Sequence, residues 1–238
     1  MYEKRVDTSV CATSVYNGAI RSRCIRVWIY PVMLYLGLVA GIVAGNLAAH
    51  AIGIDAFRVF IATLVLIPPA IIGARLLYVW MHRGRVRMWD RNAGGLAMYG
   101  GVPPMILLSI PLLAAMGVGF GAFWDAASFT ILTGIVFAKI GCLLNGCCGG
   151  KSRLGIPVQL LESMWAGGVL AAASLLVGRL PFEGALFLVV CALYGAGRFA
   201  LESLREPEAG ASRFAPGYSA SLVAVVSALT ILIVRWPR

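Results

Sequence analysis

Ionisable side chains lie inside long apolar stretches of this sequence, where an unpaired charge is costly. Asp125 and Lys139 are fourteen residues apart, so on a helix they lie about 40° from one another on one face. Arg198, Glu202 and Arg205 follow a spacing of i, i+4 and i+7, which also places them on a single helix face. Each of these charges needs a partner or a ligand, and the set comprises Arg75, Asp125, Lys139, Glu162, Arg198, Glu202 and Arg205.

Cations are in the majority in this set, which predicts an inward-facing polar cavity suited to an anionic headgroup phosphate. Arginine offers phosphate oxygens a planar bidentate fork, and lysine offers a compact point charge. The alternative interpretation is structural. Asp125 paired with Lys139, and Arg198 paired with Glu202, would tie helices together without binding a ligand.

Two glycine-rich stretches, 92–101 and 141–150, lie at the ends of apolar segments. Glycine allows a backbone to approach a ligand closely, and irregular backbone at membrane depth survives only beside a cavity. Gly100 and Gly101 are therefore candidates for contacting a phosphate. Flexible loops or helix packing on glycine are the alternatives.

Three cysteines cluster at Cys142, Cys147 and Cys148. No metal site is expected, because no histidine or acidic residue lies at ligand spacing from them. A cation such as Lys139 near Cys147 would favour its thiolate form and make it a candidate nucleophile. Cys142 is better interpreted as a small buried apolar residue.

The elements that position these residues follow from composition. The chain has 238 residues, of which 60% are hydrophobic and 13% charged, with a mean hydropathy of +0.87. Soluble domains are about 45–50% apolar and about 25% charged, so a soluble enzyme is excluded. We predict an all-α, polytopic membrane helix bundle, with a basic polar N-terminal tail at 1–26 and one transmembrane domain at 27–238.

About seven spans are expected, because a bilayer core needs about 20 apolar residues per helix. In the third span, Pro103, Pro104 and Pro111 are expected to break or kink a helix. The predicted spans are 27–48, 57–81, 95–117, 119–144, 157–178, 182–204 and 218–236.

The net charge of +10 bears on orientation as well as on lipid binding. Most lysine and arginine residues outside the predicted spans fall on the N-terminal side of the bundle. The positive-inside rule therefore predicts a cytoplasmic N-terminus.

Between about residues 71 and 221 the sequence resembles the prolipoprotein diacylglyceryl transferase family. Five segments appear in the order and with the spacing of the family's motifs. They are Gly73-Ala74-Arg75-Leu76 with Tyr78; Trp89-Asp90 with Gly94–Gly101; Asp125, Lys139, Gly141, Asn145, Gly146 and Gly150; Pro157, Gln159, Leu160 and Glu162; and Gly197-Arg198-Phe199 with Glu202, Arg205, Glu206 and Pro207.

The sequence departs from the family pattern at four single positions and in one late segment, where Ser219-Ala220-Ser221 replaces an S-x-G-Q element. Tyr99 stands where the family has its catalytic histidine, and Lys139 replaces the signature arginine. Cys142 replaces an asparagine, and Cys147 replaces a glutamate. A tyrosine with an unperturbed pKa of about 10 is a poor base, but it still donates a hydrogen bond to a phosphate oxygen.

The resemblance implies a seven-helix enzyme of the bacterial plasma membrane that moves a diacylglyceryl group from phosphatidylglycerol to a lipobox cysteine thiol. It needs no cofactor, and its partners are an anionic phospholipid and a prolipoprotein. It also implies an outward N-terminus, opposite to the charge prediction. The predicted catalytic residues are Tyr99 and Arg205, at positions of the family's motifs, together with Cys147, which is predicted from the proximity of Lys139. The predicted phosphate-binding residues are Arg75, Gly100, Gly101, Lys139, Asn145 and Arg198, and the predicted supporting residues are Asp125, Glu162 and Glu202.

Two other functions remain open from the sequence. One keeps the phospholipid donor and changes the acceptor. The other is a phospholipid-binding membrane protein without catalytic activity, which Tyr99 favours.

Overall fold

The computed structural model of the chain describes residues 13–16, 19–81, 98–145, 155–203, 225–228, 230 and 231. Side chains are described for residues 29–80, 100–145, 155–201, 225–228, 230 and 231.

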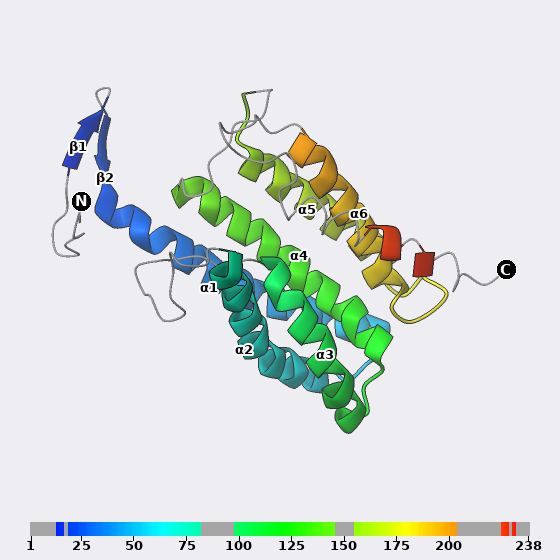
Figure 1. The fold of residues 1–238 in the computed structure, drawn as a ribbon. Helices are drawn as coiled ribbons and strands as arrows, with labels where there is room; N and C mark the ends of the chain where they lie inside the picture. The colour runs from blue at the N-terminus through cyan, green and yellow to red at the C-terminus, as the bar shows by residue number, and fades with distance from the viewer. Residues whose placement is uncertain are drawn as a thin grey trace.

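The described residues are mainly helical (Figure 1). The first six predicted spans are each confirmed as a helix, with ends within a few residues of those expected. Residues 225–228, 230 and 231, inside the seventh predicted span, are also helical. The labelled helices are α1 (Arg23–Ile52), α2 (Ala56–Met81), α3 (Met98–Met116), α4 (Phe120–Asn145), α5 (Val158–Leu176) and α6 (Ala185–Ser203).

The predicted N-terminal tail contains structure of its own. Strands β1 (Thr13–Tyr16) and β2 (Ala19–Ser22) pair antiparallel, and α1 begins directly after β2. The first helix therefore starts before residue 27, inside the segment that the sequence predicted to be a polar tail.

Within the residues that the structure describes, four helices are long and apolar enough to cross a membrane. They contain the spans Ile29–Ile52, Ala56–Trp80, Phe120–Asn145 and Val158–Leu176. Two shorter apolar helices, Gly100–Met116 and Ala185–Leu201, lie in α3 and α6.

The prolines expected to interrupt the third span do not end it. Helix α3 continues through Pro103, Pro104 and Pro111. Membrane helices tolerate proline because neighbouring groups satisfy the backbone atoms that it frees. Pro104 contributes to packing instead, because its ring lies against Gly73 of α2.

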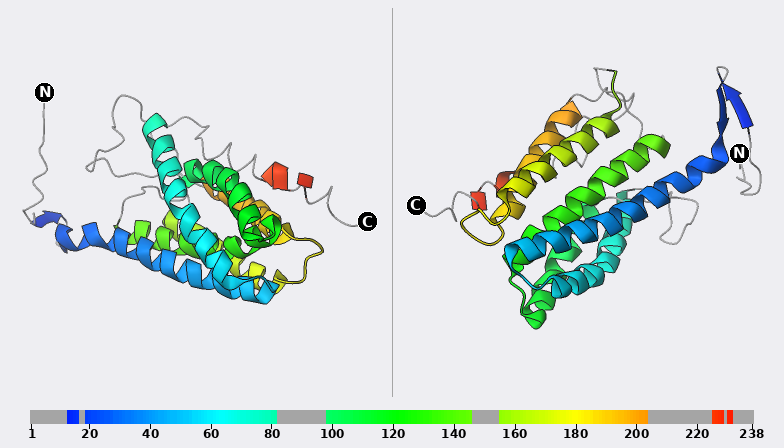
Figure 2. Two further views of the ribbon diagram at one scale, coloured as in Figure 1. Left: turned by 90° about the horizontal axis from the view of Figure 1, so that it is seen from below. Right: turned by 180° about the vertical axis from the view of Figure 1, so that it is seen from behind.

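Helix α4 is the centre of the bundle. It packs most extensively against α1, and then against α5, while α2 pairs with α3 and α5 pairs with α6 (Figures 1 and 2). The core includes the fully buried side chains of Leu66, Leu113, Phe123 and Leu132. Helices from both halves of the chain therefore meet on α4.

Glycines allow α1 to lie directly on α4. Gly37, Gly41 and Gly45 are four residues apart and face α4. A Cβ atom at Gly41 would lie 2.7 Å from the carbonyl oxygen of Thr130, and one at Gly45 would overlap the Thr130 hydroxyl. Close backbone approach of this kind stabilises helix pairs in lipid, where dispersion contacts replace the hydrophobic driving force.

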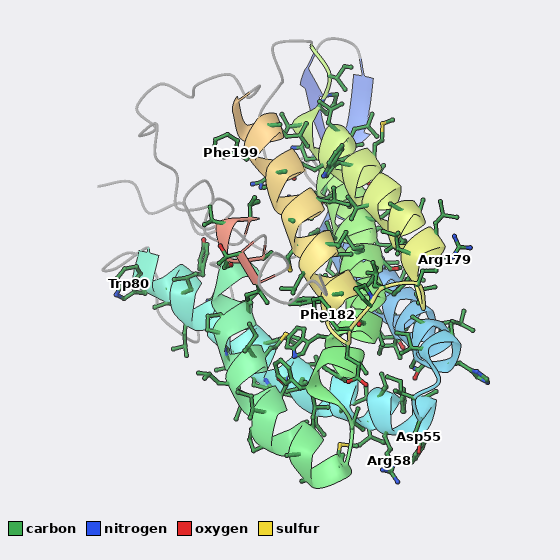
Figure 3. The ribbon with its side chains drawn as sticks, turned by 90° about the vertical axis from the view of Figure 1, so that its right-hand side faces the viewer. Asp55, Arg58, Trp80, Arg179, Phe182 and Phe199 are labelled. Atoms are coloured by element: carbon green, nitrogen blue, oxygen red, sulfur yellow. The ribbon has the colours of Figure 1, made fainter. Side chains whose placement is uncertain are left out.

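Because consecutive helices alternate in direction, the C-terminal ends of α4 and α6 lie at the same end of the bundle as the N-terminal end of α5 (Figure 1). Phe199 lies toward this end in Figure 3, and Asp55 and Arg58 lie at the other. Asp55 and Arg58 are therefore charged groups of the end opposite Phe199.

Candidate functional site

Three charged side chains from three helices meet at one end of the bundle. The Oε2 atom of Glu162 on α5 forms a salt bridge with Lys139 of α4, and its Oε1 atom forms one with Arg198 of α6. The glutamate side chain is 4% exposed, whereas those of Lys139 and Arg198 are 23% and 18% exposed. We call these residues the ion triad; each oxygen of its single carboxylate serves a different cation.

The start of α5 places Glu162 in the bundle. Pro157 precedes the helix with φ −57°, and Glu162 follows in the second turn, on the same buried face as Val158 and Gln159. The neighbouring Ser163 hydroxyl donates to the carbonyl oxygen of Val136 on α4 at 3.3 Å. This contact holds α5 against α4 one turn before Lys139.

The position of Arg198 depends on its glycine neighbour. A Cβ atom at Gly197 would overlap the indole of Trp165 on α5, so the two helices lie in close contact there. The Trp165 Nε1–H donates to the carbonyl oxygen of Leu193 at 3.1 Å, also on α6. The small residue of the Gly197-Arg198 pair therefore brings the guanidinium within reach of Glu162.

The partner predicted for Lys139 has to be corrected. Lys139 contacts Glu162, and Asp125 instead accepts hydrogen bonds from the backbone N–H groups of Gly184 and Phe187. Arg198 also contacts Glu162, and its predicted pairing with Glu202 stays a prediction because the Glu202 side chain lies outside the described set. Fourteen residues separate Asp125 from Lys139, which is about 21 Å along a helix axis. Asp125 and Lys139 were correctly inferred to share a face of α4, but they contact different partners at distant points along that helix.

Two cations and one carboxylate make up the ion triad. A carboxylate between two cations offsets the cost of placing charge at membrane depth, because each ion has a close partner. The two cations are the partly exposed members of the triad. Such an arrangement suits an anion that approaches from outside the triad.

The other predicted phosphate-binding residues lie on different elements. The Arg75 guanidinium of α2 lies 5.6 Å from the centre of the Tyr78 ring. Gly100 and Gly101 begin α3 and press against α2, since a Cβ at Gly101 would lie 2.7 Å from the carbonyl oxygen of Ala70. This contact matches the helix-packing alternative, and phosphate contact by these glycines stays a prediction.

Residues near the C-terminal end of α4 complete the described surroundings of Lys139. Asn145 is the last residue of α4 and is partly exposed, six residues beyond Lys139. Cys142, three residues beyond Lys139, is buried, as expected for a small apolar residue.

Several predicted site residues fall outside the description. Tyr99 and Glu202 belong to α3 and α6, but their side chains are outside the described set. Cys147 and Arg205 lie outside the described residues altogether. Their predicted roles, and the predicted cavity, stay predictions. Among the residues described, no cluster of three histidine, cysteine or acidic side chains is placed to hold a metal ion.

Sequence reasoning missed two features that the structure reveals. The sharing of Glu162 by two cations has no local signal, because the three residues come from different helices. The contact between α1 and α4 did have one, in the four-residue spacing of Gly37, Gly41 and Gly45.

Comparison with known proteins places the chain in a family. The family described as prolipoprotein diacylglyceryl transferase matches residues 18–234. The phosphatidylglycerol–prolipoprotein diacylglyceryl transferase of Clostridioides difficile (strain 630) is 26% identical over 192 residues, covering 74% of this chain and 77% of the relative. The Bacillus cereus (strain Q1) enzyme of the same name is 27% identical over 240 residues, covering 88% of each chain. The chain belongs to the prolipoprotein diacylglyceryl transferase family.

Proposed function

We propose that this protein is a transferase of the bacterial plasma membrane that moves a diacylglyceryl group from phosphatidylglycerol to the thiol of a lipobox cysteine. The observation that carries the proposal is the ion triad, in which two partly exposed cations, Lys139 and Arg198, are fixed side by side on Glu162. The donor's phosphodiester carries one negative charge, so two cations held together at one end of the bundle suit it.

The proposed reaction places new charge on the phosphate. The thiolate sulfur forms a bond to a glyceryl carbon, and the bond between that carbon and the phosphate oxygen breaks. The thiol proton leaves with the base or with the glycerol phosphate product. A phosphomonoester carries more negative charge than the phosphodiester it came from, so cations fixed beside it stabilise the transition state more than the ground state.

The roles of Tyr99 and Arg205, whose side chains lie outside the described set, rest on the family resemblance, and that of Cys147 rests on its expected proximity to Lys139. Tyr99 would donate a hydrogen bond to a phosphate oxygen, and Arg205 would add a further cation beside it. Cys147 would act as a nucleophile only in a two-step version, with a thioether intermediate on the protein.

The test is incubation of the purified protein with phosphatidylglycerol labelled in its acyl chains, with and without a lipobox peptide. We expect label on the peptide. Arg198→Gln should reduce this transfer about 10²-fold, because removing one donor to a developing oxyanion costs about that much. Arg58→Gln is the matched control, because Arg58 is exposed and contacts Asp55 at the other end of the bundle.

A second candidate function is phospholipid binding without turnover, which Tyr99 in the place of the family's histidine favours. The same incubation separates the two, because retained lipid with no labelled product would support binding alone. Label on a product other than the peptide would indicate a different acceptor. If Tyr99→His creates peptide lipidation where the natural chain has none, the proposed transferase function is wrong.

A further inference from the structure

Asp125 joins α4 to the beginning of α6. Its Oδ2 accepts a hydrogen bond from the Gly184 N–H at 2.7 Å, and its Oδ1 accepts one from the Phe187 N–H at 2.8 Å. The first N–H groups of a helix have no partner within the helix, so the carboxylate satisfies them from another element. Asp125 is 7% exposed, which makes this a buried contact between two helices.

The surrounding residues are shaped for this contact. Gly121 lies one turn before Asp125, and a Cβ atom there would be 2.5 Å from the carbonyl group of Glu183. Gly184 has φ +89°, a conformation that favours glycine. The Trp124 and Phe187 rings also pack together, with centroids 4.9 Å apart. The start of α6 is thus fixed against α4 by hydrogen bonds, backbone contact and ring packing.

The contact of Asp125 with the beginning of α6 lies on the same faces of α4 and α6 as the ion triad. Phe187 and Arg198 are eleven residues apart, which is about three turns and leaves them about 20° apart around α6. Asp125 and Lys139 are about 40° apart around α4. A slip of one residue in α6 would turn Arg198 by about 100° and move it about 1.5 Å along the axis. The position of Arg198 beside Glu162 therefore depends on the register set at Asp125.

We propose that Asp125 is a positioning residue for the lipid-phosphate site, because it sets the register and rotation of α6 that bring Arg198 to Glu162. The significance of Arg198 rests on the proposed function, but the positioning itself is measurable without any activity. Asp125 contacts no reacting group and acts through α6.

The test is arginine-selective labelling of the full-length protein in lipid nanodiscs with phenylglyoxal, followed by mass spectrometry of the peptide that carries Arg198. In Asp125→Asn an amide NH₂ replaces one acceptor oxygen and faces a backbone N–H, so one of the two hydrogen bonds is lost. We expect the labelling rate of Arg198 to rise several-fold, with Arg58 unchanged as an internal standard.

Asp55→Asn is the matched control variant. Asp55 also accepts hydrogen bonds at the beginning of a helix, from the N–H groups of Phe57 and Arg58, but that helix is α2. It should leave Arg198 labelling unchanged, measured in this variant against an unmodified peptide of the protein, because Asp55 pairs with Arg58 and the change alters that standard. Equal labelling of Arg198 in Asp125→Asn and the wild type, with the variant folded, would overturn the proposal, because a purely local role for Asp125 predicts that result.

A second variant addresses the case in which Asp125→Asn does not fold. Gly121→Ala keeps the carboxylate and displaces the Glu183 backbone, so it should raise Arg198 labelling by a smaller factor. Gly134→Ala on the same helix is its control, since a Cβ there meets nothing within 4 Å. Identical Arg198 labelling in these two variants would also overturn the proposal.

Transfer activity adds an independent readout. If Asp125 acts through Arg198, Asp125→Asn should reduce lipid transfer in the wild type and have no further effect in Arg198→Gln. Equal reductions in both backgrounds would contradict positioning through Arg198. Absence of transfer in the wild type would overturn the proposed function, and the labelling experiment would still decide the role of Asp125.

Discussion

Glu162 is the residue on which the described charges of the site converge. One buried carboxylate holds a lysine from α4 and an arginine from α6, so its removal would leave two like charges facing each other in an apolar bundle. Removing either cation leaves a neutral pair, which is a milder change. Removal of the Glu162 charge is therefore expected to destabilise the fold more than removal of the Lys139 or the Arg198 charge.

Glu162→Gln should be the most destabilising of them. Leaving buried charge uncompensated costs about 3–5 kcal/mol, so the free energy of unfolding should fall by about that amount. Thermal unfolding of the purified protein in detergent measures the loss. Glu183→Gln, which changes an exposed glutamate, should stay within about 0.5 kcal/mol of wild type. Equal midpoints for both variants would show that the triad does not stabilise the bundle.

Lys139 is informative because the family signature has arginine at this position. Lys139→Arg keeps the positive charge and offers phosphate a second N–H donor, so we expect it to retain lipid transfer. Lys139→Met keeps much of the side-chain length and loses the charge, and transfer should fall about 10²-fold. Rates at saturating phosphatidylglycerol check this. A Lys139→Met variant as active as wild type would remove Lys139 from the phosphate site.

At the level of elements, backbone contacts determine how closely the helices approach. Gly41 faces the backbone of Thr130 across the contact between α1 and α4, and Gly73, Gly100 and Gly101 bring α2 and α3 together. Because α4 also carries Lys139 and Asp125, a change in the separation of α1 and α4 would act on the helix that bears the site.

Gly41→Ala should test the contact between α1 and α4. Its Cβ would lie 2.7 Å from a carbonyl oxygen that cannot move without moving α4, and such overpacking costs about 1–3 kcal/mol. Gly134→Ala adds the same methyl group into open space and should be neutral or stabilising, because alanine is the better helix former. Thermal midpoints of the two variants measured side by side provide the comparison, and equal destabilisation would contradict it.

Across the bundle, the C-terminal ends of α4 and α6 and the N-terminal end of α5 lie at the same end as the beginning of α1 (Figure 1), and these helix ends carry the ion triad. Lipobox cysteines reach a transferase after export, so the proposed function requires this end to face outward. The excess of basic residues on the N-terminal side favours the opposite orientation. One measurement of orientation therefore bears on the acceptor as well as on topology.

A C-terminal reporter fusion decides between the two orientations. With seven spans and an outward N-terminus, the C-terminus is cytoplasmic, so a fluorescent protein fused there should mature and an alkaline phosphatase fusion should be inactive. The opposite pattern would exclude a lipobox thiol as the acceptor. It would leave phospholipid binding, or transfer to a cytoplasmic acceptor, as the function.

The helices were predictable because span length and hydropathy are local properties of the chain. The third span shows the limit of a local rule: its prolines predicted a break or a kink, and α3 continues through all three of them, with Pro104 packed against Gly73 of α2. The candidate site was predictable as a set of costly charges, and its pairing was not. Nothing in the spacing of Lys139 and Arg198 indicates that both contact Glu162.

Three features follow from the amino-acid sequence without neighbouring elements: the chain forms apolar helices, Asp125 and Lys139 share a face of α4, and basic groups lie within apolar spans. Hydropathy and the period of a helix are enough to infer them. Which helices meet on that face follows from the folded arrangement alone. Asp125 accepts a hydrogen bond at the beginning of α6, and Lys139 forms a salt bridge with Glu162 toward the other end of α4. The partner of a buried charge depends on how the helices pack.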